Sequence, residues 1–101
     1  MTNQKYILKG KKIIPVDLLI WAKYFETENR HIGNDSIGRT RVSTVFLGID
    51  YNFSPKGKPL LFETMIFGGK HDQYQERYST YKEAKEGHKR ALKLVKESVL
   101  S

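Results

Sequence analysis

Weak alternation of apolar and polar residues marks the first fifteen positions of the chain. Residues 5–9 (KYILK) alternate, Gly10 interrupts the pattern, and residues 11–14 resume it. Two short apolar runs on either side of a glycine indicate a short strand or a small hairpin. Pro15 is expected to end this element, because proline has no backbone N–H to donate to a strand ladder.

The next apolar positions have helical spacing. Asp17 stands where an N-cap is expected, because its carboxylate can accept a hydrogen bond from a free amide of the first turn. The helix should run to about Asn29, with an apolar stripe at Leu18, Trp21, Ala22 and Phe25. Gly33 is expected to end it in a left-handed conformation. Residues 30–38 have the composition of turns throughout.

Two strands are predicted in the middle of the chain. Residues 40–50 are rich in β-branched and aromatic side chains, and both faces of this segment are largely apolar at its centre. That pattern favours a central strand that is covered on both sides or nearly so. A loop at residues 52–59 leads to a second strand at residues 60–67, and so short a connection makes the two strands antiparallel neighbours.

A last strand at residues 75–79 leads into a C-terminal helix. Thr80 and Glu83 have the spacing of a capping box, in which each side chain accepts a hydrogen bond from the backbone N–H of the other residue. The apolar stripe of this helix consists of Ala84, His88, Ala91, Leu92, Val95 and Val99. The order β-α-β-β-β-α predicts an α+β domain in which an antiparallel sheet of three to four strands carries two helices on one face.

The composition narrows the class of protein. With 101 residues, of which 39% are hydrophobic, the chain is expected to form a single domain over residues 1–101. The absence of cysteine excludes a disulfide, a thiol nucleophile and a thiolate metal ligand. The longest apolar run is far shorter than the ~20 residues that span a bilayer, and the N-terminus lacks a signal-peptide pattern. We therefore expect a soluble, cytoplasmic protein with no membrane partner.

Positive charge is concentrated at the two ends of the chain. Eighteen lysine and arginine residues against eleven aspartate and glutamate residues give a net charge of +7. Residues 1–15 carry four lysines and no acidic residue, and residues 81–101 carry six basic and three acidic residues. These two segments account for the whole net charge, which attracts anions such as nucleotides or nucleic acid.

Catalytic and metal sites find little support in the sequence. His31, His71 and His88 lack the spacing of metal ligands, and no serine has the surroundings of a catalytic nucleophile. We therefore expect no metal, no cofactor and no catalytic residue. A small nucleotide hydrolase that uses Asp50, Glu63 or His71 is the least favoured hypothesis.

Arginines and hydroxyl groups near the strand ends and at the start of the last helix favour a phosphate site. Arginines neutralise phosphate, hydroxyls and helix N-terminal amides orient it, and a tyrosine can stack on a base. The same pattern is compatible with an ordinary polar sheet end. The candidate ligand-binding residues are Arg39, Arg41, Ser43, Arg77, Tyr78, Ser79 and Thr80.

The basic C-terminal helix offers an alternative binding surface. Its lysines can follow a phosphate backbone or meet an acidic protein face, but glutamates interrupt them in the sequence. The candidate residues of this surface are Lys85, Lys89, Arg90 and Lys93.

Three segments together resemble a group of small accessory proteins of tailed bacteriophages and prophages. The segments are RVSTVFLGID (41–50), LFETMIFGG (61–69) and ERYSTY (76–81). The resemblance covers most of the chain from the predicted helix at Asp17 onward, and it carries no catalytic residue. It implies an early or accessory phage protein in the host bacterial cytoplasm, and small phage proteins of this kind often blunt host defence.

These expectations combine into one leading hypothesis. We expect a phage anti-defence protein that sequesters a small phosphorylated, nucleotide-derived signal without turnover and that forms a homo-oligomer. The alternative is a blocker of a host defence protein or nucleic-acid complex that acts through the basic C-terminal helix.

Overall fold

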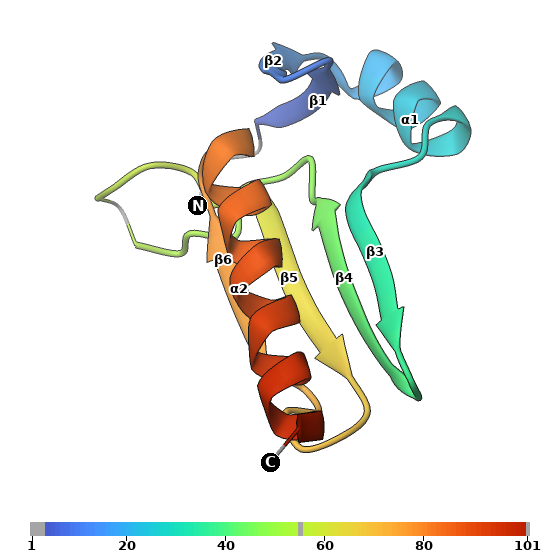
Figure 1. Ribbon diagram of the computed structural model, residues 1–101. Coiled ribbons are helices and arrows are strands. Elements are labelled where there is room, and N and C mark those ends of the chain that lie inside the picture. Colours follow the sequence, from blue (N-terminus) through green and yellow to red (C-terminus); the bar gives the residue numbers. More distant parts are fainter. Residues whose placement is uncertain (1–3, 55, 101) are drawn as a thin grey trace.

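The computed structural model describes residues 4–54 and 56–100 (Figure 1). Its elements form two antiparallel sheets and two helices, which confirms the predicted α+β class. Strand β3 was absent from the predicted order, and the N-terminal segment, predicted as a short strand or a small hairpin, is the hairpin β1–β2. In chain order the elements are β1 (Lys5–Lys9), β2 (Lys12–Val16), α1 (Leu18–Thr27), β3 (His31–Ile37), β4 (Thr40–Phe46), β5 (Phe62–Phe67), β6 (Gln75–Tyr78) and α2 (Tyr81–Leu100).

The N-terminal segment is a hairpin in which β2 continues through Pro15 rather than ending there. Lys9 pairs with Lys12 across a turn in which Gly10 has a φ of +63°, a conformation that glycine adopts without steric cost. Pro15 is accommodated because β2 is an edge strand, where a missing N–H is tolerated.

Helix α1 begins where predicted but ends earlier. The Asp17 carboxylate accepts a hydrogen bond from the backbone N–H of Ile20 (2.9 Å), which confirms the N-cap. The helix ends at Thr27, before the predicted Asn29, and Gly33 does not terminate it but lies in β3.

The segment with turn-like composition forms the edge strand β3. It pairs with β4 along its length, with an irregularity in register between His31 and Gly33. Polar residues such as Asn34 and Ser36 are compatible with this strand because their side chains stay exposed while β4 supplies the backbone hydrogen bonds. Tertiary pairing thus outweighs the local turn preference, and the actual turn is limited to residues 38–39.

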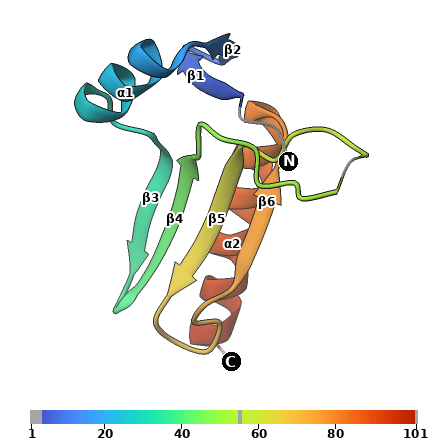
Figure 2. The ribbon, with the colours of Figure 1, turned by 180° about the vertical axis from the view of Figure 1, so that it is seen from behind.

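The larger sheet is an antiparallel meander with the order β3-β4-β5-β6. The predicted pairing of the two middle strands is confirmed, with Val42 opposite Ile66 and Phe46 opposite Phe62. Strand β4 is central, as predicted, but only one face of the sheet is covered. Helix α2 lies on that face, and neither helix of the described residues lies over the other face (Figure 2). We call the second face the open face.

The core lies between α2 and the sheet. It consists mainly of apolar side chains from both layers, each at most 2% exposed. Burial of one large apolar side chain contributes about 1.5–3 kcal/mol, so this layer stabilises the domain. These residues are Val42, Phe46, Leu61, Phe62, Ile66, Ala84, Ala91 and Val95.

The predicted packing of a helix on one face of the sheet is confirmed for α2, whereas α1 packs against β1 beyond one end of the sheet (Figure 1). The indole N–H of Trp21 donates to the carbonyl oxygen of Gly48 (3.1 Å), and the ring of Tyr24 meets that of Phe46 edge-on. Because only residues 28–30 separate α1 from β3, the connection is too short to bring α1 over the sheet face.

Candidate functional site

Three of the predicted ligand-binding residues lie on the open face. Arg41 and Ser43 alternate along β4 with residues that face α2, and Arg77 occupies the equivalent side of β6. The Arg41 guanidinium lies over the ring of Phe67 (4.6 Å), and Arg77 donates to the Glu63 carboxylate (2.9 Å). Both arginines are therefore already engaged by neighbours within the sheet.

The other four predicted residues lie elsewhere, so the structure does not bring the seven together. Arg39 occupies the β3–β4 turn, whereas Ser79 and Thr80 follow β6 at the opposite end of the sheet, roughly 25 Å away along the strand direction. The side chain of Tyr78 is only 5% exposed and contacts the core beneath α2.

Thr80 forms the predicted capping box. Its hydroxyl accepts from the backbone N–H of Glu83 (3.1 Å), and the Glu83 carboxylate accepts from the backbone N–H of Thr80 (3.1 Å). The first turn of α2 is thus partly satisfied by its own side chains, so an anion near it would depend on other positive groups.

The residues of the hydrolase hypothesis have separate structural roles. Asp50 accepts hydrogen bonds from the backbone N–H groups of Asn52 and Leu60 and so holds the β4–β5 connection closed. Glu63 binds Arg77 on the open face, and His71 lies in the β5–β6 connection, beyond the far end of β5. The three side chains do not form one cluster.

A groove of about 700 Å³ lies beside the first turns of α2. We call it the basic groove. Four exposed lysines from two distant segments line it, together with the ring of Tyr81. Lys11, from the turn of the β1–β2 hairpin, has its ammonium group 5.9 Å from the centre of that ring. Its lining residues are Lys11, Thr80, Tyr81, Lys82, Lys85, Glu86 and Lys89.

The lysines of α2 form a continuous stripe. At 100° per residue, five lysines fall within a sector of about 80°, and the three glutamates fall together on one flank of it. The glutamates that interrupt the lysines in the sequence therefore do not interrupt them on the helix surface. The lysine stripe consists of Lys82, Lys85, Lys89, Lys93 and Lys96.

The four predicted residues of the basic helix separate accordingly. Lys85 and Lys89 line the basic groove. Lys93 belongs to the stripe and lies 3.8 Å from the Glu97 carboxylate. Arg90 instead binds Glu76 of β6 (2.9 Å). Sequence reasoning left Lys11 out of this surface; the signal that could have included Lys11 was the excess charge of residues 1–15.

The basic groove joins the two segments that hold the net charge of the protein. The β1–β2 hairpin lies beyond the N-terminal end of α2 (Figure 1), and Lys11 reaches Tyr81 from there. Since residues 16–80 are neutral overall, the excess positive charge lies on the N-terminal segment and along α2, and the basic groove stands where the two meet. A groove with such charge and an aromatic wall can bind phosphate groups beside a ring system.

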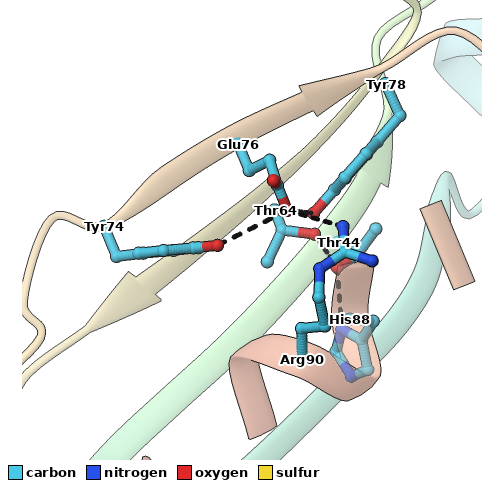
Figure 3. A network of polar contacts seen from close by, with 7 residues as sticks. All are labelled: Thr44, Thr64, Tyr74, Glu76, Tyr78, His88 and Arg90. Atoms are coloured by element: carbon cyan, nitrogen blue, oxygen red, sulfur yellow. Dashed lines mark hydrogen bonds and ion pairs between the residues drawn. The ribbon is translucent and has the colours of Figure 1, made fainter. Parts of the chain in front are cut away.

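A buried polar network connects α2 with the sheet (Figure 3). The Thr44 hydroxyl lies 2.7 Å from Nδ1 of His88 and 2.6 Å from the Thr64 hydroxyl, and Nε2 of His88 lies 2.7 Å from the Asp35 carboxylate. The order hydroxyl–imidazole–carboxylate is that of a catalytic triad. However, Thr44 is 0% exposed, so no substrate can reach it, and the network serves to fix α2 on the sheet.

The second part of the network centres on Glu76. Its carboxylate accepts hydrogen bonds from Arg90 (2.9 Å), Tyr78 (2.8 Å) and Tyr74 (3.4 Å). Burial acts to raise the pKa of Glu76, but these hydrogen bonds outweigh it and lower the pKa below its ordinary value. Burial is also the main reason why the pKa of Tyr78 is raised.

The sequence predicted no metal site, and the structure shows how the metal-binding side chains in the described part of the chain are grouped. Within residues 4–54 and 56–100, no three histidine, aspartate or glutamate side chains form a group that could hold a metal ion. In the same residues, no helix is both long and apolar enough to cross a membrane.

No known protein family, curated protein or solved structure matches the chain.

Proposed function

We propose that the protein binds a phosphorylated, nucleotide-type ligand in the basic groove and holds it without turnover. The observation that carries this proposal is the meeting of Lys11 with the lysines of α2 around one cavity beside Tyr81. Lysine ammonium groups are compact positive charges that suit phosphate oxygens, and the tyrosine ring offers a surface for a base or sugar.

The lining of the groove supports binding rather than hydrolysis. Among its described residues, the one carboxylate is Glu86, and the Thr80 hydroxyl is already engaged by the capping box. Neither a nucleophile with a neighbouring base nor a pair of carboxylates is part of this lining. The ligand would therefore be held by charge and stacking and released unchanged.

A nucleic-acid strand is a second candidate ligand, because the lysine stripe extends past the groove. Lys93 and Lys96 continue it for about 10 Å beyond Lys89, a span over which the phosphates of a strand recur. A mononucleotide would leave these two lysines without a phosphate. Each phosphate contact with a strand adds about 0.7–0.9 to the slope of log affinity against log salt, which separates the two ligands experimentally.

This activity fits the phage context that the sequence resemblance implies. A protein that holds a nucleotide-derived signal lowers its free concentration in the host bacterial cytoplasm and so blunts a defence that depends on it. A homo-oligomer would carry several such grooves. Sequestration needs affinity and abundance but no catalytic residue, which agrees with the lining of the groove.

The test compares two variants that remove the same number of charges. One carries glutamine in place of Lys82, Lys85 and Lys89 in the groove; the matched control carries glutamine at three exposed lysines elsewhere, Lys23, Lys58 and Lys70. Calorimetry with ATP and with inorganic tripolyphosphate measures small-ligand binding, and fluorescence anisotropy with a labelled single strand measures nucleic-acid binding.

The groove variant is expected to lose roughly 10–100-fold in affinity for ATP and tripolyphosphate, because three exposed charge contacts contribute roughly 0.5–1 kcal/mol each. The control variant should bind nearly as the wild type does. Equal losses in both variants would mean that net charge alone attracts the ligand, and absence of binding to all three probes would overturn the proposal. A strand that binds far more tightly than ATP, with a steep salt dependence, would favour the nucleic acid.

A further inference from the structure

A second, smaller pocket adjoins the basic groove at Tyr81 and at the β1–β2 turn. It has a volume of about 220 Å³ and is bordered by β1, the end of α1, the start of β3 and the start of α2. Tyr81 borders both cavities, and Gly10, which lines the pocket, precedes Lys11, which lines the groove. We call this second cavity the polar pocket.

The polar pocket combines two aromatic rings with hydrogen-bonding groups. Tyr24 and Tyr81 line it, and both side chains are half-buried. Glu28, Asn29 and His31 add a carboxylate, an amide and an imidazole at its exposed rim. These residues come from segments up to 57 positions apart, and the fold alone brings them together.

Several of these polar groups are not engaged by the protein. Among the described residues, the Glu28 carboxylate and the Tyr81 hydroxyl form no hydrogen bond. Asn29 uses its side-chain oxygen to accept from the backbone N–H of His31 (3.0 Å), which leaves its NH₂ group available. Nδ1 of His31 lies 3.1 Å from the same oxygen, so Nε2 remains available.

We propose that the polar pocket receives the base of a guanine nucleotide whose phosphates lie in the basic groove. This inference rests on the proposed function and specifies its ligand. Tyr81 borders both cavities, and the ammonium group of Lys11 lies near its ring. Tyr81 would therefore lie at the junction between the base and the phosphates. The small volume suits one ring system rather than a whole nucleotide, and an aromatic wall provides a surface on which a base can stack.

The free carboxylate of Glu28 determines the choice of base. A carboxylate only accepts hydrogen bonds, and its two oxygens suit a pair of parallel N–H donors. Guanine presents such a pair on one edge, the ring N1–H and the exocyclic amino group. Adenine and cytosine present an amino group beside a ring acceptor, and uracil presents one N–H between two carbonyl groups, so each offers this carboxylate fewer donors.

The experiment measures the affinities of GTP, ATP, CTP, UTP and inorganic tripolyphosphate for the full chain by calorimetry. Two matched variants accompany the wild type: Glu28→Gln alters the polar pocket, and Glu26→Gln alters an exposed glutamate of α1 that does not line it. Both changes remove one negative charge, so both favour any triphosphate slightly through charge alone.

The wild type is expected to bind GTP at least tenfold more tightly than the other three nucleotides. Glu28→Gln should remove this preference while leaving tripolyphosphate affinity unchanged or slightly higher, and Glu26→Gln should retain the preference. Equal binding of all four nucleotides, or a guanine preference that persists in Glu28→Gln, would overturn the inference while the proposed function stands. Failure of all five probes to bind would overturn both.

Discussion

Replacing Gly87 by alanine should destabilise the protein, although the same change in an ordinary helix stabilises it. Gly87 lies in the buried side of α2, and a Cβ added there would overlap with the hydroxyl oxygen and ring carbon Cζ of Tyr78. Tyr78 cannot easily move away, because its ring is 5% exposed and its hydroxyl donates to Glu76 (2.8 Å).

The magnitude follows from three contributions. Alanine in place of a helical glycine gains about 1 kcal/mol of helix propensity. Inserting a methyl group into a packed interior costs about 1–3 kcal/mol. If Tyr78 rotates to make room, the loss of its hydrogen bond to the Glu76 carboxylate costs about 1.5–3 kcal/mol more. The net loss is therefore about 1 kcal/mol if Tyr78 stays in place and about 3 kcal/mol if it rotates, which lowers the melting temperature of a domain of this size by about 5–20 °C.

Urea unfolding followed by circular dichroism measures this loss. The exposed neighbour Glu86 provides the control, since Glu86→Ala should change the free energy of unfolding by no more than about 0.5 kcal/mol. In a Tyr78→Leu background, Gly87→Ala should lose most of its cost, because the overlapping atoms are gone. A Gly87→Ala variant as stable as the wild type or more so would refute the packing of Tyr78 against α2.

Two further predictions concern the polar network. Hydrogen bonds, including that from Arg90, lower the pKa of Glu76, so the wild type should lose stability relative to Glu76→Gln as the pH falls from about 5 to 3. Urea unfolding at several pH values measures the difference in unfolding free energy between the two proteins. A difference that stays constant with pH would contradict the pKa shift. Thr44→Val should lower the free energy of unfolding by about 1–3 kcal/mol, because it leaves Nδ1 of the buried His88 without a partner. Asp35→Asn should lower it by less than about 1 kcal/mol in the same urea assay, because the Asp35 side chain is 55% exposed.

Local signals predicted the elements whose chemistry lies within a few residues of sequence. The Asp17 N-cap and the capping box of Thr80 and Glu83 depend on neighbours along the chain, and the structure contains both. The short connection at residues 52–59 likewise predicted the antiparallel pairing of β4 with β5. By contrast, the composition of residues 31–37 indicates turns, and this segment becomes a strand because β4 provides a partner for its backbone.

The candidate sites could not be placed from the sequence. In an antiparallel meander, successive connections between strands lie at alternate ends of the sheet, so residues near strand ends need not lie near each other. Arg39 precedes β4 and Thr80 follows β6, so both appear near strand ends in the sequence, yet they stand at opposite ends of the sheet. The partner of His88 is similarly hidden, since Asp35 lies 53 residues away on an edge strand that was not predicted. Residue type indicated polar and anion-binding chemistry, whereas position required the topology.

The basic groove depends on a glycine that takes no part in it. The N-terminal hairpin is joined to the sheet at Gly48, whose carbonyl oxygen accepts hydrogen bonds from the backbone N–H of Tyr6 (2.9 Å) and from the indole of Trp21 (3.1 Å). Gly48 has a φ of +76°, and a Cβ there would lie 2.5 Å from the ring of Phe25. A larger residue is therefore excluded twice, by the backbone conformation and by the aromatic packing. These contacts at Gly48 hold the hairpin that carries Lys11. The position of Lys11 in the basic groove therefore depends on packing at the end of the sheet, just as the other lysines of the groove depend on α2.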